Sequence, residues 1–393
     1  MHKELPKGKV FRKLNRNLFY PRLISKAIHP AKKHLSPATC HLPPVVHISS
    51  QCYAHLIPAA LTARPSCTQS PVSSIQYPAP LVSITVHDVA EFYYPEGYTP
   101  AQFKRWKKRI DLVKQADLVF AVSGHTKKDL VEKAGVPADK IVVNYNGVDP
   151  AFRKLSEDEV LKGTEALPPS ASLWRTRGEA QEERFRILAV GSNIHRKNLP
   201  TLIKAVEELG RRGVPITLVK VGEAVPDSLI PSAQSPAPNA KHPASSVQNL
   251  EVINLGFVNQ DELISLYNLC DVLAFPSLYE GFGMPVVEAQ RCGLPCVISN
   301  ASSLPEVGGD AALYHDPLDV DMLADQLERV YGDEDLRSGM REKGFRNAQR
   351  FTWKQHVDIL MKEWEKLSGV ARNIGVISRR SQSAQRGAKW TRS

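Results

Sequence analysis

The chain has 393 residues, more than one domain usually holds, so the sequence predicts two domains. Its hydrophobic content of 42% and charged content of 23% are ordinary for a folded globular protein. The net charge of +10 is concentrated at the ends: residues 1–33 hold ten Lys and Arg against one acid, and residues 368–393 hold six and no acid. A nucleic-acid-binding protein usually carries its positive charge on the folded body, so this distribution argues against nucleic acid as a partner.

Residues 1–39 form a basic segment with interleaved apolar side chains. This segment has two interpretations: it lies on an anionic membrane surface, or it is a solvated basic arm. No apolar run approaches the roughly 20 residues that cross a bilayer. The six cysteines show no metal-binding spacing and are interpreted as small core thiols. We therefore expect a cytoplasmic protein, with peripheral membrane contact as the alternative.

Alternating strands and helices begin after the basic segment. Residues 81–86, 116–122 and 140–144 are predicted to be short buried strands, with a helix over 126–134. This alternation predicts a parallel sheet in a first domain at residues 40–155.

A second alternating series follows a polar linker at 156–183 and predicts a second domain at 184–350. Its predicted strands are 186–190, 216–221, 250–255, 272–275 and 295–298, and its predicted helices include 199–211 and 260–269. Residues 225–249, rich in Pro, Ser and Ala, are predicted to be a disordered insert. The chain then predicts a cross-over helix at 351–367, capped by Thr352, and a disordered basic tail at 368–393.

Two carboxylates, Glu280 and Glu288, flank a glycine-rich turn and a predicted helix start. Pro285 suits the first helical turn, where its missing N–H would be unpaired anyway. Gly281 and Gly283 let the backbone approach a ligand closely. Free amides of the first turn favour an anion, and flanking carboxylates suit hydroxyls, so the pattern predicts a nucleotide-sugar site. A helix cap beside a solvated Glu is the alternative, which the glycines and the strand-loop-helix context disfavour.

This stretch resembles the signature of the retaining glycosyltransferases of family 4, also called glycosyl transferases group 1. The resemblance covers roughly residues 80 to 367, with two inserts. Further motifs that carry it are Val86-His87-Asp88, residues 116–123, 146–149, Val190-Gly191, Arg196-Lys197-Asn198, 255–257 and 302–306.

The resemblance implies an α/β protein of GT-B architecture, with two Rossmann-like domains facing each other across a cleft. It implies retaining transfer of a hexose to a glycan or lipid acceptor. The residues of the 196–198 and 277–283 motifs are most similar to the mannosyltransferase branch. GDP-mannose is the first expected donor and a UDP-sugar the second, with no other cofactor. The implied catalytic residues are His87, Lys197 and Glu280. The implied donor-binding residues are Gly191, Ser192, Arg196, Lys197, Glu280, Gly281, Phe282, Gly283, Met284 and Glu288.

The first 80 residues depart from the family pattern. The family opens with a strand and a glycine-rich loop, whereas only Gly8 occurs in residues 1–80. Residues 45–50 and 53–56 instead resemble a later family strand and its loop. The first domain is therefore expected to lack its first β-α unit. A truncated gene model, a diverged start or an inactive relative would each explain this.

The leaving phosphate must be stabilised by a metal or by protein cations. The pair Asp319 and Asp321 matches a metal-binding pattern, but it precedes a predicted helix, where capping is the expected role. The resemblance instead implies that Lys197 binds the phosphate without a metal. Ser192 stands where the family often has Arg, and Arg196 is the candidate replacement. An inactive relative that binds nucleotide or a partner protein is the alternative function. A nicotinamide enzyme would need G-x-G-x-x-G after a strand, which no predicted strand has.

Overall fold

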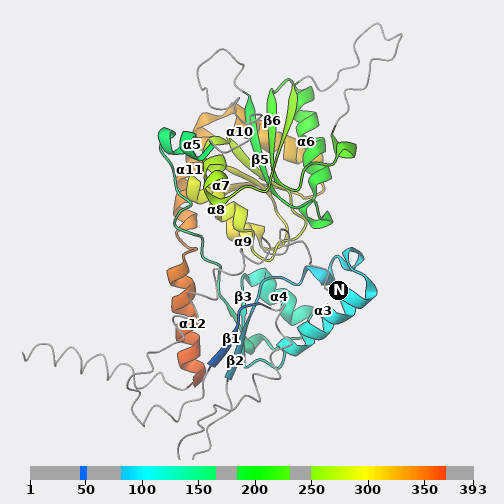
Figure 1. Cartoon of the computed structure of the whole chain (residues 1–393), viewed down its shortest axis with the longest axis vertical. Helices are drawn as coiled ribbons and strands as arrows, with labels where there is room; N and C mark the ends of the chain where they lie inside the picture. The colour runs from blue at the N-terminus through cyan, green and yellow to red at the C-terminus, as the bar shows by residue number, and fades with distance from the viewer. Residues whose placement is uncertain (1–44, 51–80, 165–183, 231–248, 369–393) are drawn as a thin grey trace, which may run out of the picture.

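The computed structural model describes residues 45–50, 81–164, 184–230 and 249–368. In this part of the chain the strands form a four-stranded and a six-stranded sheet, and every strand pair is parallel (Figure 1). Parallel neighbours need crossover connections, most of which are helices here. The prediction of two α/β domains is confirmed.

The first domain holds a sheet of order β1-β2-β3-β4. Its strands are β1 (Val45–Ile48), β2 (Leu81–Val86), β3 (Leu118–Ala121) and β4 (Ile141–Val143), and its helices are α3 (Pro100–Val113) and α4 (Gly124–Glu132). Helix α3, which the sequence analysis did not predict, begins at a capping box of Thr99 and Gln102. The expected loss of a first β-α unit concerns residues that, apart from 45–50, lie outside the described part of the chain.

The second domain holds a sheet of order β10-β9-β8-β5-β6-β7. Its strands are β5 (Phe185–Gly191), β6 (Ile216–Gly222), β7 (Leu250–Gly256), β8 (Val272–Phe275), β9 (Cys296–Ser299) and β10 (Ala312–His315). Its helices are α6 (Leu199–Arg211), α7 (Gln260–Leu269), α8 (Met284–Cys292), α9 (Leu304–Gly308), α10 (Val320–Gly332) and α11 (Glu334–Ala348). The chain leaves β5 in one direction through β6 and β7, then continues on the other side of β5 with β8. Such a switch point creates a ligand-binding crevice at the carboxyl ends of the strands.

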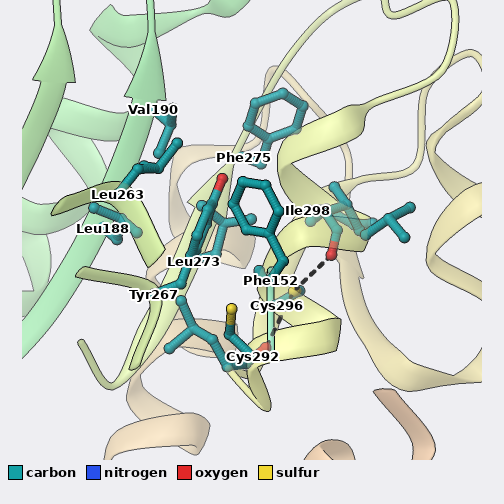
Figure 2. Packing of buried hydrophobic residues seen from close by; sticks show 14 of the residues in the cluster. Phe152, Leu188, Val190, Leu263, Tyr267, Leu273, Phe275, Cys292, Cys296 and Ile298 are labelled. Atoms are coloured by element: carbon teal, nitrogen blue, oxygen red, sulfur yellow. Dashed lines mark hydrogen bonds between the residues drawn. The ribbon is translucent and has the colours of Figure 1, made fainter. Parts of the chain in front are cut away.

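Apolar side chains cover both faces of the six-stranded sheet. Figure 2 shows one of these clusters, in which Phe152 and Tyr267 lie near Cys292 and Cys296. Both thiols and that of Cys270 are free and buried, as the sequence predicted. The remaining three cysteines precede residue 81 and lie outside the described residues.

Helix α12 (Trp353–Ser368) returns from the second domain to the first, along the four-stranded sheet (Figure 1). Leu360 packs on Leu118 and Phe120, and the indole N–H of Trp364 donates to the Ser83 hydroxyl at 2.9 Å. Thr352 accepts from the Gln355 amide at 3.2 Å. The predicted cross-over helix and its cap are therefore confirmed.

Two predicted loops are partly regular structure. Residues 156–183 were expected to form a linker, but Glu157–Thr164 form helix α5, which packs closely on α7 where Gly163 meets Ser265. Residues 225–230 were placed in the insert, yet Val225 is buried and Asp227–Leu229 form a 3-10 helix. Residues 165–183 and 231–248, and both basic ends, lie outside the described residues. No helix of the described part is long and apolar enough to cross a membrane.

Candidate functional site

Two loops meet at the switch point, one after β5 and one after β8. The first contains Gly191, with a φ of 138°, and a 3-10 turn, His195–Lys197. The second runs from Pro276 into the glycine-rich turn. The two are tied together, because the Leu278 amide donates to the Arg196 carbonyl at 2.8 Å and the Asn198 side chain donates to the Pro276 carbonyl at 3.0 Å.

Glu280 is the centre of an ionic cluster between these loops. Its side chain is nearly buried, at 7% exposure. Lys197 Nζ lies 2.5 Å from Glu280 Oε1, and Arg196 Nη1 lies 3.3 Å from Glu280 Oε2. Burial alone would raise the pKa of Glu280, but the charges of Lys197 and Arg196 outweigh it and lower the pKa below its ordinary value. The cluster therefore holds two cations against one carboxylate.

A third cation, Lys220, lies at the same place and was missed by the sequence analysis. It belongs to β6, is buried, and donates to the Gly191 carbonyl at 2.5 Å. Burial, opposed by the charge of Glu223 and aided by that of Lys197, lowers the pKa of Lys220 from 10.5 to about 8. A small pocket at the carboxyl ends of β5, β6 and β8 is lined by Gly191, Ser192, Lys197 and Lys220. Lys220 is the one charged residue of β6, and a charge within a buried strand is the sequence signal that could have identified it.

Helix α8 begins directly after the Glu280 turn. Gly283 precedes it with a φ of 97°, which favours glycine, and Pro285 lies in its first turn. Met284, one of the expected donor-binding residues, is the first residue of the helix, and the predicted place of Pro285 in the first turn is confirmed. Phe282, one of the expected donor-binding residues, has a buried ring whose centroid lies 5.4 Å from that of Phe351.

Glu288 lies one turn into α8 and is nearly buried, at 7% exposure. Its Oε2 accepts from the Tyr267 hydroxyl at 2.9 Å. This hydrogen bond fixes the orientation of the Glu288 carboxylate.

His87 ends β2 in the first domain, and the structure brings it to the Glu280 turn. The His87 carbonyl lies where a Cβ on Gly281 would be, so only glycine permits this approach of the two domains. His87 Nε2 donates to the Ser49 carbonyl at 3.1 Å. Burial lowers the pKa of His87, although Ser49 and Asp88 oppose the shift. The imidazole is therefore neutral near pH 7.

The segment after β9 supports the same turn. Ser303 donates from its hydroxyl to the Glu280 and Phe282 carbonyls at 2.9 and 3.0 Å, and the Glu280 amide donates to Ser302 Oγ at 2.8 Å. These contacts fix the backbone of the Glu280 turn. Asp319 caps α10, because its side chain accepts from the Met322 amide at 2.9 Å. The predicted capping role of Asp319 is confirmed.

The candidate site thus gathers Gly191, Ser192, Arg196, Lys197 and Glu280 at the switch point, with the start of α8 beside them. Gly281 joins it to His87, and Glu288 lies further along α8. A two-domain α/β protein with clustered cations and a helix N-terminus between the domains has the architecture of GT-B glycosyltransferases.

Sequence comparison agrees with this class. The family profile "Glycosyltransferase Family 4" matches residues 5–152, and the profile "Glycosyl transferases group 1" matches residues 171–347. The two profiles together cover most of the chain, which belongs to this glycosyltransferase family.

Curated relatives include the O-antigen chain mannosyltransferase B of Escherichia coli, 29% identical over 68% of this chain and 66% of that protein. The serotype-specific mannosyltransferase WbdA of E. coli is 28% identical over 68% of this chain, and the match spans only 31% of WbdA. Among solved structures, sucrose-phosphate synthase of Thermosynechococcus elongatus has a TM-score of 0.61 at 18% identity, covering 94% of this chain and 81% of that chain. Anabaena HepE in complex with UDP and glucose has a TM-score of 0.60 at 19% identity, covering 88% and 81%.

Proposed function

We propose that this protein transfers a hexose, mannose in the first instance, from a nucleoside-diphosphate sugar to a glycan or lipid-linked acceptor with retention of configuration. The main support for this proposal is the ionic cluster at the switch point, in which Lys197 Nζ and Arg196 Nη1 lie 2.5 and 3.3 Å from the Glu280 carboxylate oxygens. The E. coli relatives that are named mannosyltransferases, at 28–29% identity, support mannose. GDP-mannose is the first donor proposed, and a UDP-sugar is the second.

The diphosphate would bind to Lys197, Arg196 and the first amides of α8. Two cations against one carboxylate leave an excess of positive charge, and the buried Lys220 adds to it. Because these groups are already fixed in a poorly solvated place, they stabilise charge that develops on the leaving phosphate without reorganising. Arg196 thereby supplies the cation that Ser192 does not.

The two carboxylates would take hydroxyls on either side of the phosphates. Glu280 would accept from hydroxyls of the sugar, since it adjoins the phosphate-binding lysine, and Glu288 would accept from the ribose. His87, which is neutral and lies across the domain boundary, would contact a sugar hydroxyl or orient the acceptor.

The reaction breaks the bond between the sugar C1 and the phosphate oxygen and forms a bond from the acceptor oxygen to C1 on the same face. The acceptor proton passes to the leaving phosphate oxygen. No group of the protein forms a covalent bond to the sugar, so Glu280 acts by holding the donor. Lys197 and Arg196 carry the charge that a metal supplies in other transferases.

The test uses the full chain with GDP-mannose, a UDP-sugar and a mannoside acceptor. We expect nucleoside diphosphate release coupled to a new glycosidic bond, whose anomeric configuration is read by NMR. Lys197→Ala should lower the rate about 100-fold or more, because a preorganised cation is lost. Lys204→Ala is the matched control, since Lys204 is exposed on α6 outside the site.

The same experiment separates the alternative, an inactive relative. Saturable donor binding without transfer to any mannoside, and without release of nucleoside diphosphate, would support that alternative. An inverted product would contradict retention, and equal losses in the two lysine variants would remove Lys197 from the site.

A further inference from the structure

The Glu280 turn is held on both sides by a helix of the other domain. Tyr279, which precedes Glu280, donates its hydroxyl to Asp129 Oδ2 of α4 at 2.6 Å. Gly281, which follows Glu280, accepts at its carbonyl from the Thr126 hydroxyl of α4 at 3.1 Å. The two contacts therefore bracket the carboxylate that would hold the sugar.

Asp129 is built to receive one tyrosine from each domain. Its side chain is buried, and its second oxygen accepts from Tyr93, of its own domain, at 2.6 Å. His125 Nε2 lies 3.3 Å from Oδ2. Burial would raise the pKa of Asp129, but the nearby His125 ring and the hydrogen bonds from Tyr279 and Tyr93 outweigh it and lower the pKa. An ionised acceptor makes both tyrosine bonds charge-assisted, which strengthens them.

The N-terminus of α4 is in turn held by the second domain. Glu306 Oε1 accepts from the Gly124 amide and from the Tyr145 hydroxyl, each at 2.8 Å, and Oε2 accepts from the His125 amide at 3.3 Å. A carboxylate at the start of a helix meets its free amides and the positive end of its dipole. Glu306 lies three residues after Ser303, whose hydroxyl donates to the Glu280 carbonyl. The second domain therefore contacts α4 both through the turn itself and through Glu306.

We propose that Asp129 and Thr126 are positioning residues that fix the Glu280 turn, so that the donor site is completed by the first domain. That the turn binds the donor rests on the proposed function. That Asp129 and Thr126 hold the turn rests on their hydrogen bonds to Tyr279 and Gly281, whatever the turn binds. Small displacements of a reacting group cost large factors in rate, so a turn fixed from outside gives the donor a preformed site.

The test compares two substitutions in the full chain, each of which removes one tyrosine bond to Asp129. Tyr279→Phe removes the bond that crosses between the domains, and Tyr93→Phe removes a bond of the same length to the same carboxylate within the first domain. Both variants keep the rings that lie 5.0 Å apart. Amide hydrogen exchange of the peptide spanning residues 276–283 is a readout that needs no substrate.

We expect Tyr279→Phe to raise exchange in this peptide about tenfold and Tyr93→Phe to change it less than about twofold. Calorimetry with GDP and UDP should show weaker binding for Tyr279→Phe by about tenfold, with transfer reduced in parallel. The double variant of Tyr279→Phe and Asp129→Ala should be no worse than Asp129→Ala alone, since both substitutions remove the same bond. For Thr126, we expect Thr126→Val to loosen the peptide and Thr126→Ser to restore it.

Equal exchange in the two tyrosine variants would overturn the positioning role, as would additive losses in the double variant. If the parent chain binds neither nucleotide, the proposed function fails. The exchange measurement would still decide whether α4 positions the turn.

Discussion

Lys197 Nζ and Glu280 Oε1 lie 2.5 Å apart, although the residues follow different strands and are 83 positions apart in the chain. The charge of Lys197 is thus paired with a carboxylate inside the protein. Under the proposed function, a donor would compete with Glu280 for Lys197 and Arg196, and the sugar hydroxyls would then give Glu280 new partners.

Replacing this carboxylate should separate phosphate binding from sugar transfer. In Glu280→Gln the two cations lose their internal counter-ion, so the affinity for the free nucleoside diphosphate should rise about threefold to tenfold. Transfer should fall by about 100-fold, because the sugar hydroxyls lose an ionised acceptor and meet an amide NH2 in place of one oxygen. Calorimetry and a transfer assay measure the two effects. Glu288→Gln is the control and should weaken nucleoside diphosphate binding. Unchanged or weaker binding by Glu280→Gln would mean that Glu280 does not compete with the phosphates.

The close contact of the two domains at Gly281 can be tested with one methyl group. A Cβ at Gly281 would meet the His87 carbonyl, so Gly281→Ala should destabilise the protein by about 2 kcal/mol and abolish transfer. Gly339→Ala is the matched control, because Gly339 lies within α11 with nothing within 4 Å of its Cβ position. It should stabilise the protein by about 1 kcal/mol. Urea unfolding of both variants measures the two changes in the free energy of unfolding. A stable, active Gly281→Ala protein would contradict the close contact between Gly281 and the His87 carbonyl.

Glu91 predicts a pH dependence of stability. Burial, aided by Asp88, raises the pKa of Glu91 from 4.5 to about 7, and its Oε2 has no hydrogen-bond partner among the described residues. A carboxyl with a raised folded-state pKa contributes stability below pH 4.5 that is lost as the pH rises through about 7. Glu91→Gln should therefore match the parent near pH 4.5 and exceed it at pH 8. Urea unfolding at the two pH values measures the difference, and the exposed Glu96→Gln should show none. A Glu91→Gln protein that is less stable than the parent at pH 8 would contradict a raised pKa for Glu91.

Metal independence is a prediction that follows from the role given to Lys197. Transfer should persist in EDTA. Asp319→Ala should cost about 1 kcal/mol of stability through the lost α10 cap and leave the rate unchanged. Loss of transfer in chelator, restored by manganese, would instead favour metal binding by Asp319 and Asp321.

The elements of the second domain could largely be predicted from local pattern. The predicted bounds of α6, α7 and β8 agree with the structure. Helix α7 carries its own start signal in the capping box of Asn259 and Glu262. Helix α11 was not predicted, because it is polar and buries only a few side chains, so its sequence has no clear apolar period. Helix α5 was missed for a related reason, since its charged sequence resembles a linker.

The sequence by itself determined the strand-helix order, the glycine-rich turn and the candidate pair of Glu280 and Glu288, because these depend on residue type at short spacing. Only the tertiary structure decided the partners of these groups. Strand order places Lys220 in the pocket beside Lys197, and Asp129 contacts Tyr279 across 150 positions of the chain. The strength of an ionic or hydrogen-bonded contact depends on burial and on the groups that folding brings beside it, and neither is encoded in local spacing.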